Sequence, residues 1–397
     1  MHLEFSKKEE LFREEVSSWL SKNLKGKFKP VVGRGGSGDQ TELLEERVEW
    51  EKHMGKSGWT CIGWPKKFGG RNASINEQVI FYEEYTKAGG PGRIGHIGET
   101  LAGPTIISFG SKEQQKRFLP KIRLGEEYWC QGYSEPSAGS DLSAVKTKAE
   151  LVKGKWKING QKIWTSLAKE SDWIFVLCRT TKKSSGREGL SYILVPMSQP
   201  GITIQPIKQI TGQSEFNEVF FDNAETQEEN VVGEVGEGWK VAMGTLGFER
   251  GTSTLGQQMA FEQEFNTILK IAKENGSSEI PSIKNQLSEA WIGLRIMRFN
   301  ALRMLSNSRD GLLSKEAMLS KLYWATWHRN LGKLAMDVLG MESEIGDKLP
   351  YDLTFLQKMF LFTRSDTIYA GTNQIQRNII SERALGMPKE PRGDNKK

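Results

Sequence analysis

Two short polar segments carry the residue types best suited to hold a small ligand. Their sequences are WCQGYSEPSAGSD over residues 129–141 and GQKIWTS over residues 160–166. Hydroxyl groups and the backbone N–H groups of small residues suit a ligand with many acceptors, and a tryptophan beside them can cover a flat ring. The same residue types are also typical of ordinary turns, so composition alone leaves both interpretations open.

Other chemistries have less support in the sequence. Residues 33–38 match the G-x-G-x-x-G pattern of dinucleotide-binding turns, but Pro30 argues against a buried strand before them and no second strand follows at βαβ distance. A flexible loop between helices is therefore the favoured interpretation. The chain has no G-x-x-x-x-G-K-[ST] motif, and its four histidines have no metal-ligand spacing. We therefore expect neither a P-loop nor a metal site.

Length and composition narrow the class of protein. The chain has 397 residues, 12 of them tryptophan, and its hydrophobic content of 37% is enough for a large buried core. This length predicts two or three packed units. The net charge of +6 is spread along the chain, so we expect no nucleic-acid partner.

The compartment can also be predicted from the sequence. Cys61, Cys130 and Cys178 are far apart and show no C-x-x-C spacing, which fits a reducing compartment. The first residues lack the apolar region of a secretory signal. Apolar runs fall well short of the roughly 20 residues that cross a bilayer. We expect a cytoplasmic protein with no membrane span.

The hydrophobic period changes twice along the chain. Apolar residues recur at helical spacing in residues 7–24, 41–54, 76–86 and 111–123. Residues 145–221 instead hold short β-branched and aromatic runs separated by turn signals such as Asn159-Gly160. Strands so closely spaced leave no room for βαβ crossovers, which favours an antiparallel barrel or sandwich. Helical spacing returns after residue 238.

The predicted fold is therefore α+β and multidomain. We expect an N-terminal helical domain over residues 1–124, a middle antiparallel β-barrel or sandwich over residues 125–235, and a C-terminal helical bundle over residues 236–397.

Six motifs, in their order along the chain, closely resemble the acyl-CoA dehydrogenase family. They are Gly58-Trp59 with WPKKFGG (64–70), YSEPSAGSD (133–141), NGQKIWTS (159–166), FNEVFF (216–221), FERG (248–251) and IYAGTNQIQR (368–377). The resemblance spans essentially the whole chain and agrees with the α-β-α order. It implies a flavoprotein oxidoreductase of lipid metabolism, with FAD at the β domain and a CoA thioester on one flavin face. The reaction would be α,β-dehydrogenation to the trans-2-enoyl-CoA.

The resemblance also implies a set of cofactor contacts. Ser134 would bond the pyrimidine edge of the flavin, Trp164 would cover the ring, and Ser166 would reach its N5 side. Ser140 would approach the diphosphate or the pantetheine of the substrate. The other implied cofactor contacts are Gln131 and Tyr133 beside the ring, and Thr372 and Gln374 in the C-terminal motif.

The catalytic base departs from the commonest family pattern. Many relatives place a glutamate directly before Gly-Thr in the C-terminal motif, where this chain has Ala370. A subset that handles branched or bulky acyl groups instead carries its glutamate on the helix after the β domain, in a Glu-Arg pair that Glu249-Arg250 matches. The resemblance thus implies Glu249 as base, Arg250 as a substrate contact, and a branched, cyclic or bulky acyl group. The Ala370 backbone N–H would still polarise the thioester carbonyl.

A second departure concerns assembly. The chain lacks the R-x-x-F-G element with which many relatives reach the FAD diphosphate of a neighbouring subunit, and Lys284 in that region offers only a point charge. The family implies a homodimer or homotetramer through the C-terminal helices, with a heteromer as the alternative. An apolar stripe wide enough for core or interface consists of Ala290, Trp291, Leu294, Met297, Ala301 and Leu305.

The resemblance implies an electron-transfer flavoprotein as electron acceptor. Two other functions stay open. One is a non-catalytic or heteromeric partner subunit of an active relative, and the other is an acyl-CoA oxidase, because oxygen access depends on the shape of the cavity.

Overall fold

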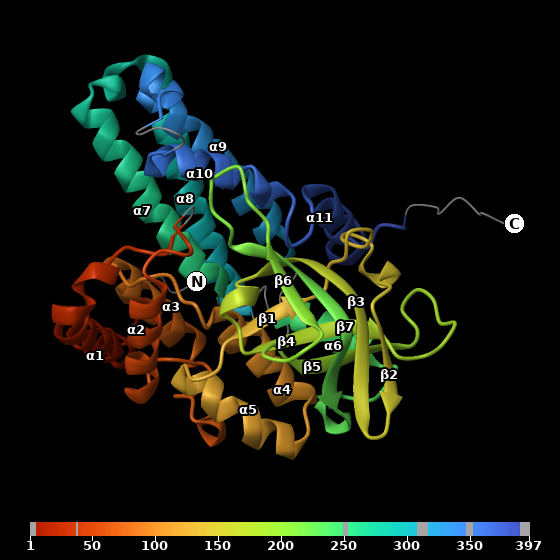
Figure 1. Cartoon of the computed structure of the whole chain (residues 1–397). Coiled ribbons are helices and arrows are strands. Elements are labelled where there is room, and N and C mark those ends of the chain that lie inside the picture. Colours follow the sequence, from red (N-terminus) through yellow and green to blue (C-terminus); the bar gives the residue numbers. More distant parts are fainter. Residues whose placement is uncertain (1–4, 37–38, 249–252, 308–316, 347–351, 390–397) are drawn as a thin grey trace, which may run out of the picture. The chain divides into compact units, whose positions relative to one another are not determined.

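The computed structural model describes residues 5–36, 39–248, 253–307, 317–346 and 352–389 (Figure 1). The contacts between residues divide the chain into two compact units. One comprises Phe5–Gly256, and the other consists chiefly of Gln257–Lys397. In the part of the chain that is described, no helix combines the length and the apolar character needed to cross a membrane.

Helices form the first part of the Phe5–Gly256 unit, as the periodicity predicts. Three of them begin with a serine that accepts a hydrogen bond from the N–H three residues on, while the Glu or Gln there bonds back to the serine N–H. This reciprocal cap satisfies two backbone donors that a helix start leaves unpaired. The helices are α1 (Lys7–Asn23), α2 (Leu44–Lys56), α3 (Ile75–Lys87), α4 (Gly103–Phe109) and α5 (Lys112–Leu124), with a π-helical turn, η3 (Gly98–Ala102), before α4.

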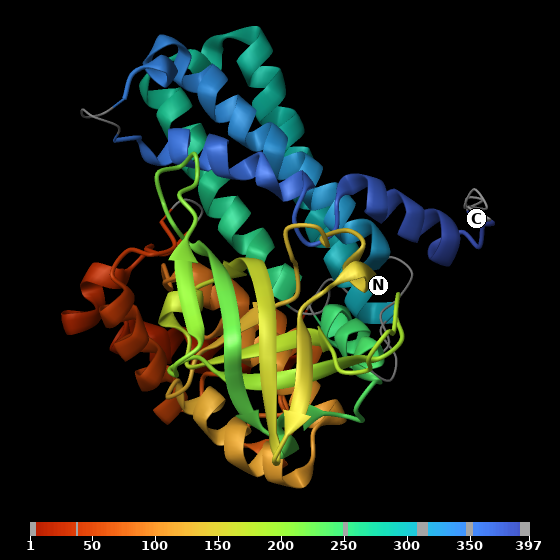
Figure 2. The same cartoon turned by 45° about the vertical axis from the view of Figure 1, so that its right-hand side comes forward.

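An eight-stranded sheet follows, in the order β6-β7-β3-β2-β4-β5-β8, with β1 beside β4. Most pairs are antiparallel, but β1 and β4 run parallel, and a single parallel pair joins β2 to β4. Figure 2 shows the long strands β3 (yellow) and β7 (green) side by side. The strands are β1 (Trp129–Gly132), β2 (Lys148–Val152), β3 (Lys155–Ser166), β4 (Trp173–Arg179), β5 (Leu190–Pro196), β6 (Ile202–Pro206), β7 (Phe216–Gln227) and β8 (Val231–Val232).

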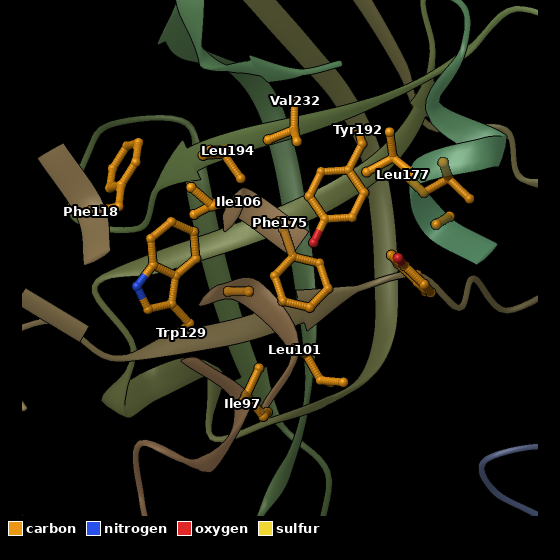
Figure 3. Close-up of a cluster of buried hydrophobic side chains, with 14 of the residues drawn as sticks. Ile97, Leu101, Ile106, Phe118, Trp129, Phe175, Leu177, Tyr192, Leu194 and Val232 are labelled. Atoms are coloured by element: carbon orange, nitrogen blue, oxygen red, sulfur yellow. The ribbon is translucent and has the colours of Figure 1, made fainter. Parts of the chain in front are cut away.

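Strand β4 is buried on both faces, which explains its unbroken apolar sequence WIFVLC. On one face Phe175 and Leu177 join a core that includes side chains of η3, α4, α5 and α6 (Gly238–Phe248). In that core the ring of Phe175 stacks on Tyr192 at 5.2 Å between centroids (Figure 3). On the other face Ile174 and Val176 pack in a core with residues of β3 and β7. Strand β4 thus lies between a layer of helices on one side and strands β3 and β7 of the same sheet on the other.

The Gln257–Lys397 unit is helical. Its helices are α7 (Ser253–Glu274, which begins in the other unit), α8 (Pro281–Asn307), α9 (Ala317–Leu339), α10 (Phe355–Thr363) and α11 (Asn373–Ile379). On α8, Leu294, Met297 and Ala301 are buried in the core, but Trp291 is 53% exposed. The core face of α8 is therefore narrower than the apolar stripe in its sequence.

Candidate active site

The two polar segments lie side by side in the Phe5–Gly256 unit. The N–H of Ile163 on β3 donates to the backbone carbonyl of Ser134, 2.9 Å away, just beyond the end of β1. A tight turn follows, in which Glu135 and Ala138 exchange two backbone hydrogen bonds of 3.0 Å. The segment after β1 and the end of β3 are thereby hydrogen-bonded side by side.

A buried ion pair fixes this junction. The Lys162 side chain is fully buried, and its Nζ lies 2.8 Å from Glu135 Oε1, 3.0 Å from the Tyr133 carbonyl oxygen and 2.7 Å from the Leu177 carbonyl oxygen. Three acceptors match the three N–H donors of an ammonium group. Lys162 therefore ties β3 to the turn after β1 and to β4 at once.

The partner carboxylate of Lys162 is held equally firmly. Glu135 Oε2 accepts the Lys146 N–H at 2.6 Å, and Oε1 accepts the Thr147 N–H at 2.9 Å. Burial favours the neutral carboxyl, but the Lys162 charge and these N–H groups outweigh it and hold the pKa of Glu135 below its ordinary value. The carboxylate is thus charged at neutral pH and orders residues 146–147 as well.

Trp164 protrudes from this rigid junction. It has a left-handed backbone, with φ of 61°, at a point where the β3–β7 register shifts between Lys162 and Thr165. Its side chain is 55% exposed, and the ring meets Phe216 edge-on. A bulky residue in this conformation costs about 1–3 kcal/mol, and strain of this kind clusters at functional sites.

The hydroxyl residues of the site flank Trp164. Ser134 and Ser166 are half-buried, so part of each residue is exposed to solvent. A flat indole beside such hydroxyls fits an isoalloxazine ring, which needs a covered face and hydrogen bonds at its edge. The cofactor residues predicted on these two segments are therefore chemically suited to a flavin.

The remaining residues of the first segment differ in surroundings. Gln131 is half-buried on β1, opposite Phe175. The Tyr133 ring lies in the core, edge-on to Phe175 and Tyr192. Ser140 is exposed after the turn, where it is open to a large ligand.

The C-terminal motif lies in the other unit. Ala370 has φ of 50° and is exposed, and its carbonyl oxygen accepts the Gln376 side-chain amide at 3.2 Å. Among the described residues the Ala370 N–H has no acceptor. The Thr372 hydroxyl caps α11 by accepting the Ile375 N–H at 3.2 Å, and Gln374 is exposed. This turn can offer one free backbone donor to a ligand.

Two predicted residues, Glu249 and Arg250, lie outside the described residues. Lys284 is exposed on α8. The Glu135–Lys162 pair was not predicted, although both residues stand inside the two motifs. A buried location for a lysine cannot be inferred from its neighbours in the sequence.

Three domain models of one family match the chain in succession. The acyl-CoA dehydrogenase N-terminal domain matches residues 6–126, the middle domain residues 130–224, and the C-terminal domain residues 236–385. Together they cover most of the sequence.

Similar proteins carry matching names. Acyl-CoA dehydrogenase IpdE1 of Mycobacterium tuberculosis is 52% identical, over 97% of this chain and 99% of its own length. A solved structure described as the Tcur3481-Tcur3483 steroid ACAD has a TM-score of 0.85 and 27% identity, over 98% of this chain and 100% of that one. The ChsE4-ChsE5 complex from Mycobacterium tuberculosis gives a TM-score of 0.81 and 26% identity, over the same shares.

Proposed function

The chain belongs to the acyl-CoA dehydrogenase family, and we propose that it oxidises the Cα–Cβ bond of a bulky acyl-CoA with bound FAD. Members of this family are FAD-dependent enzymes. The observation that carries the proposal for this chain is the junction of the two polar segments, which Lys162 and Glu135 lock and from which Trp164 protrudes.

Bound FAD would supply the hydride acceptor. Trp164 would cover one part of the ring, and the hydroxyls of Ser134 and Ser166 would bond its edge. Gln131, Tyr133, Ser140, Thr372 and Gln374 complete the proposed set of cofactor contacts. Because the Tyr133 ring is buried in the core, its contact would come from the backbone. Ser140 is also proposed to meet the substrate.

Proton removal requires a base and a site for the developing negative charge, because a thioester α-proton is only weakly acidic. We assign the base to Glu249, with Arg250 as a substrate contact. The free N–H of Ala370 supports a role as donor to the thioester oxygen. A backbone donor does not depend on the side chain, so an alanine can serve where relatives have glutamate.

We propose a branched, cyclic or polycyclic acyl group as the substrate. The methyl group of Ala370 fills less space than a glutamate side chain would. The similarity to a protein described as a steroid ACAD supports a ring-bearing acyl group. We further propose that the enzyme works in the cytoplasm and passes its electrons to an electron-transfer flavoprotein.

The similarity to a two-component complex favours a heteromeric assembly over the homodimer or homotetramer. The ChsE4-ChsE5 structure, similar over 98% of this chain, is a complex of two components. The absence of an R-x-x-F-G element from the sequence fits a chain that relies on a different subunit.

Anaerobic reduction tests the proposed activity. The purified protein, alone and co-expressed with candidate partner subunits, is mixed with straight-chain, branched and polycyclic acyl-CoAs while the flavin absorbance is followed. We expect bleaching fastest with a polycyclic acyl-CoA. A folded protein that takes up no FAD in either preparation contradicts the cofactor assignment. Full turnover that releases stoichiometric hydrogen peroxide without an added acceptor assigns an oxidase instead.

A further inference from the structure

A buried histidine between two carboxylates lies in the Gln257–Lys397 unit. His328 on α9 is 1% exposed. Its Nε2 lies 2.6 Å from Glu264 Oε2 on α7, and its Nδ1 lies 2.7 Å from Asp366 Oδ2 in η9 (Ser365–Thr367). We call these three residues the histidine network. None of them belongs to a motif that the proposed reaction uses.

The geometry defines the protonation state of His328. A neutral imidazole has only one N–H. Its other ring nitrogen carries a lone pair, which would be repelled by the lone pairs of the facing carboxylate oxygen. A protonated ring donates from both nitrogens. Burial alone would lower the pKa of His328, but Glu264 and Asp366 outweigh it and raise that pKa to about 9. The network therefore holds an imidazolium at neutral pH.

A lysine and two aromatic rings surround the histidine network. Lys321, also on α9, contacts the Asp366 backbone carbonyl through its Nζ and lies over the Tyr369 ring at 5.1 Å. Phe261 on α7 covers the imidazole at 4.2 Å between centroids. The His328 imidazolium thus lies between two carboxylates and against an aromatic ring, so losing its charge leaves two buried carboxylates facing each other.

The network reaches the Ala370 turn through one further bond. The Tyr369 hydroxyl donates to Asp366 Oδ1 at 2.7 Å, whereas His328 bonds the other carboxylate oxygen, Oδ2. The peptide bond between Tyr369 and Ala370 carries the N–H assigned to the thioester oxygen. Gln376 holds the other side of the same residue through the Ala370 carbonyl. The direction of this N–H is therefore set from two sides.

We propose that Glu264, His328, Asp366 and Tyr369 are positioning residues that aim the Ala370 N–H at the thioester carbonyl. The proposal rests on the proposed function. Because the oxyanion donor acts mainly in the transition state, a misplaced N–H lowers kcat more than it raises KM.

The decisive variant is Tyr369→Phe, which removes the last link and leaves the histidine network intact. Its control is Tyr323→Phe, which removes a hydroxyl that bonds the Gly293 carbonyl at 3.4 Å in the same helical core. We expect Tyr369→Phe to keep its flavin and to stay folded with a modestly lower melting temperature, because one hydrogen bond to a buried carboxylate is lost. It should lose about tenfold in kcat, less than the loss from deleting an oxyanion donor outright. Tyr323→Phe should stay within twofold of the parent.

A second measurement separates this proposal from the proposed function. Amide hydrogen exchange of a peptide spanning residues 365–372 should accelerate in Tyr369→Phe and in His328→Gln, but not in Tyr323→Phe. Unchanged exchange in Tyr369→Phe, or a kcat equal to that of the parent, overturns the positioning role. If the exchange changes as expected while no acyl-CoA reduces the parent protein, the network orders the turn and the proposed dehydrogenation is wrong.

Discussion

Lys162 Nζ lies 2.8 Å from Glu135 Oε1, and this buried pair joins the two chain segments proposed to hold the flavin. The lysine has no solvent contact and three oxygen acceptors. Its role is therefore to fix the backbone from which Ser134 and Trp164 extend, and not to touch a ligand itself.

Lys162→Met should strongly destabilise the protein and empty the flavin site. Removing one partner of a buried pair leaves the other charge unpaired, which costs about 3–5 kcal/mol. Thermal unfolding and the flavin-to-protein ratio measure both effects. Adding Glu135→Gln should recover part of the loss, because the unpaired charge disappears.

Lys157→Met is the matched control for that variant. Lys157 stands on the same strand, but its side chain is 39% exposed in a 3.6 Å pair with Glu225, so the change should stay within about 0.5 kcal/mol. Equal destabilisation by the two lysine changes would refute the role assigned to the buried pair.

Trp164→Ala should weaken FAD binding with little effect on folding. The half-exposed indole adds little to the core, while a lost aromatic contact with the ring costs on the order of 1 kcal/mol or more. Isothermal titration of the apoprotein with FAD gives the affinity. Leu151→Ala, which truncates an exposed apolar side chain on β2, should leave the affinity unchanged. An unaltered FAD affinity in Trp164→Ala would remove this residue from the site.

Glu249→Gln should keep the flavin but slow its reduction by acyl-CoA roughly 10²-fold or more, the usual contribution of a positioned base. Stopped-flow absorbance under anaerobic conditions follows the reduction. The control is Glu237→Gln, an exposed glutamate just before α6, which should reduce at the parent rate. Near-normal reduction in Glu249→Gln would assign proton removal to another group.

The free energy of unfolding should fall as pH rises through about 9, because of His328. Its pKa is raised from 6.5 to about 9 in the folded protein, so the stabilisation is complete below pH 6.5 and is lost above the folded value. The loss is on the order of 3 kcal/mol. Urea unfolding at several pH values measures it, and His328→Gln should flatten this part of the curve. A parent protein that gains stability between pH 7 and 10 would contradict a charged His328.

Periodicity predicted the helical elements well where one face packs on a core. The helix expected over residues 7–24 is α1 (Lys7–Asn23), because a capping serine and a clear apolar stripe define it. The α-β-α architecture of the acyl-CoA dehydrogenase family is confirmed. Trp291 shares the helical spacing of Leu294 and Met297 but is exposed, because this spacing places a residue near a face without distinguishing core from surface.

Contacts between residues that are far apart in the chain could not be predicted from the sequence. Strand β1 has four residues, and its parallel pairing with β4 depends on a segment more than 40 positions away. His328 meets Glu264 and Asp366, which are 64 and 38 residues distant. A lone histidine without ligand spacing gives no sign of such neighbours. The chemical motifs identified the candidate site, but only the fold reveals what holds it in place.

The histidine network also bears on how the Gln257–Lys397 unit opens. The charged groups of the network come from α7, α9 and the η9 turn. If any one of these elements moved alone, a charge without its partner would be left in the interior. Partly open forms of these three elements are therefore costly, and they should open together in a single cooperative step. Amides in α7 and α9 should then share one slow exchange rate, set by the opening of the unit as a whole.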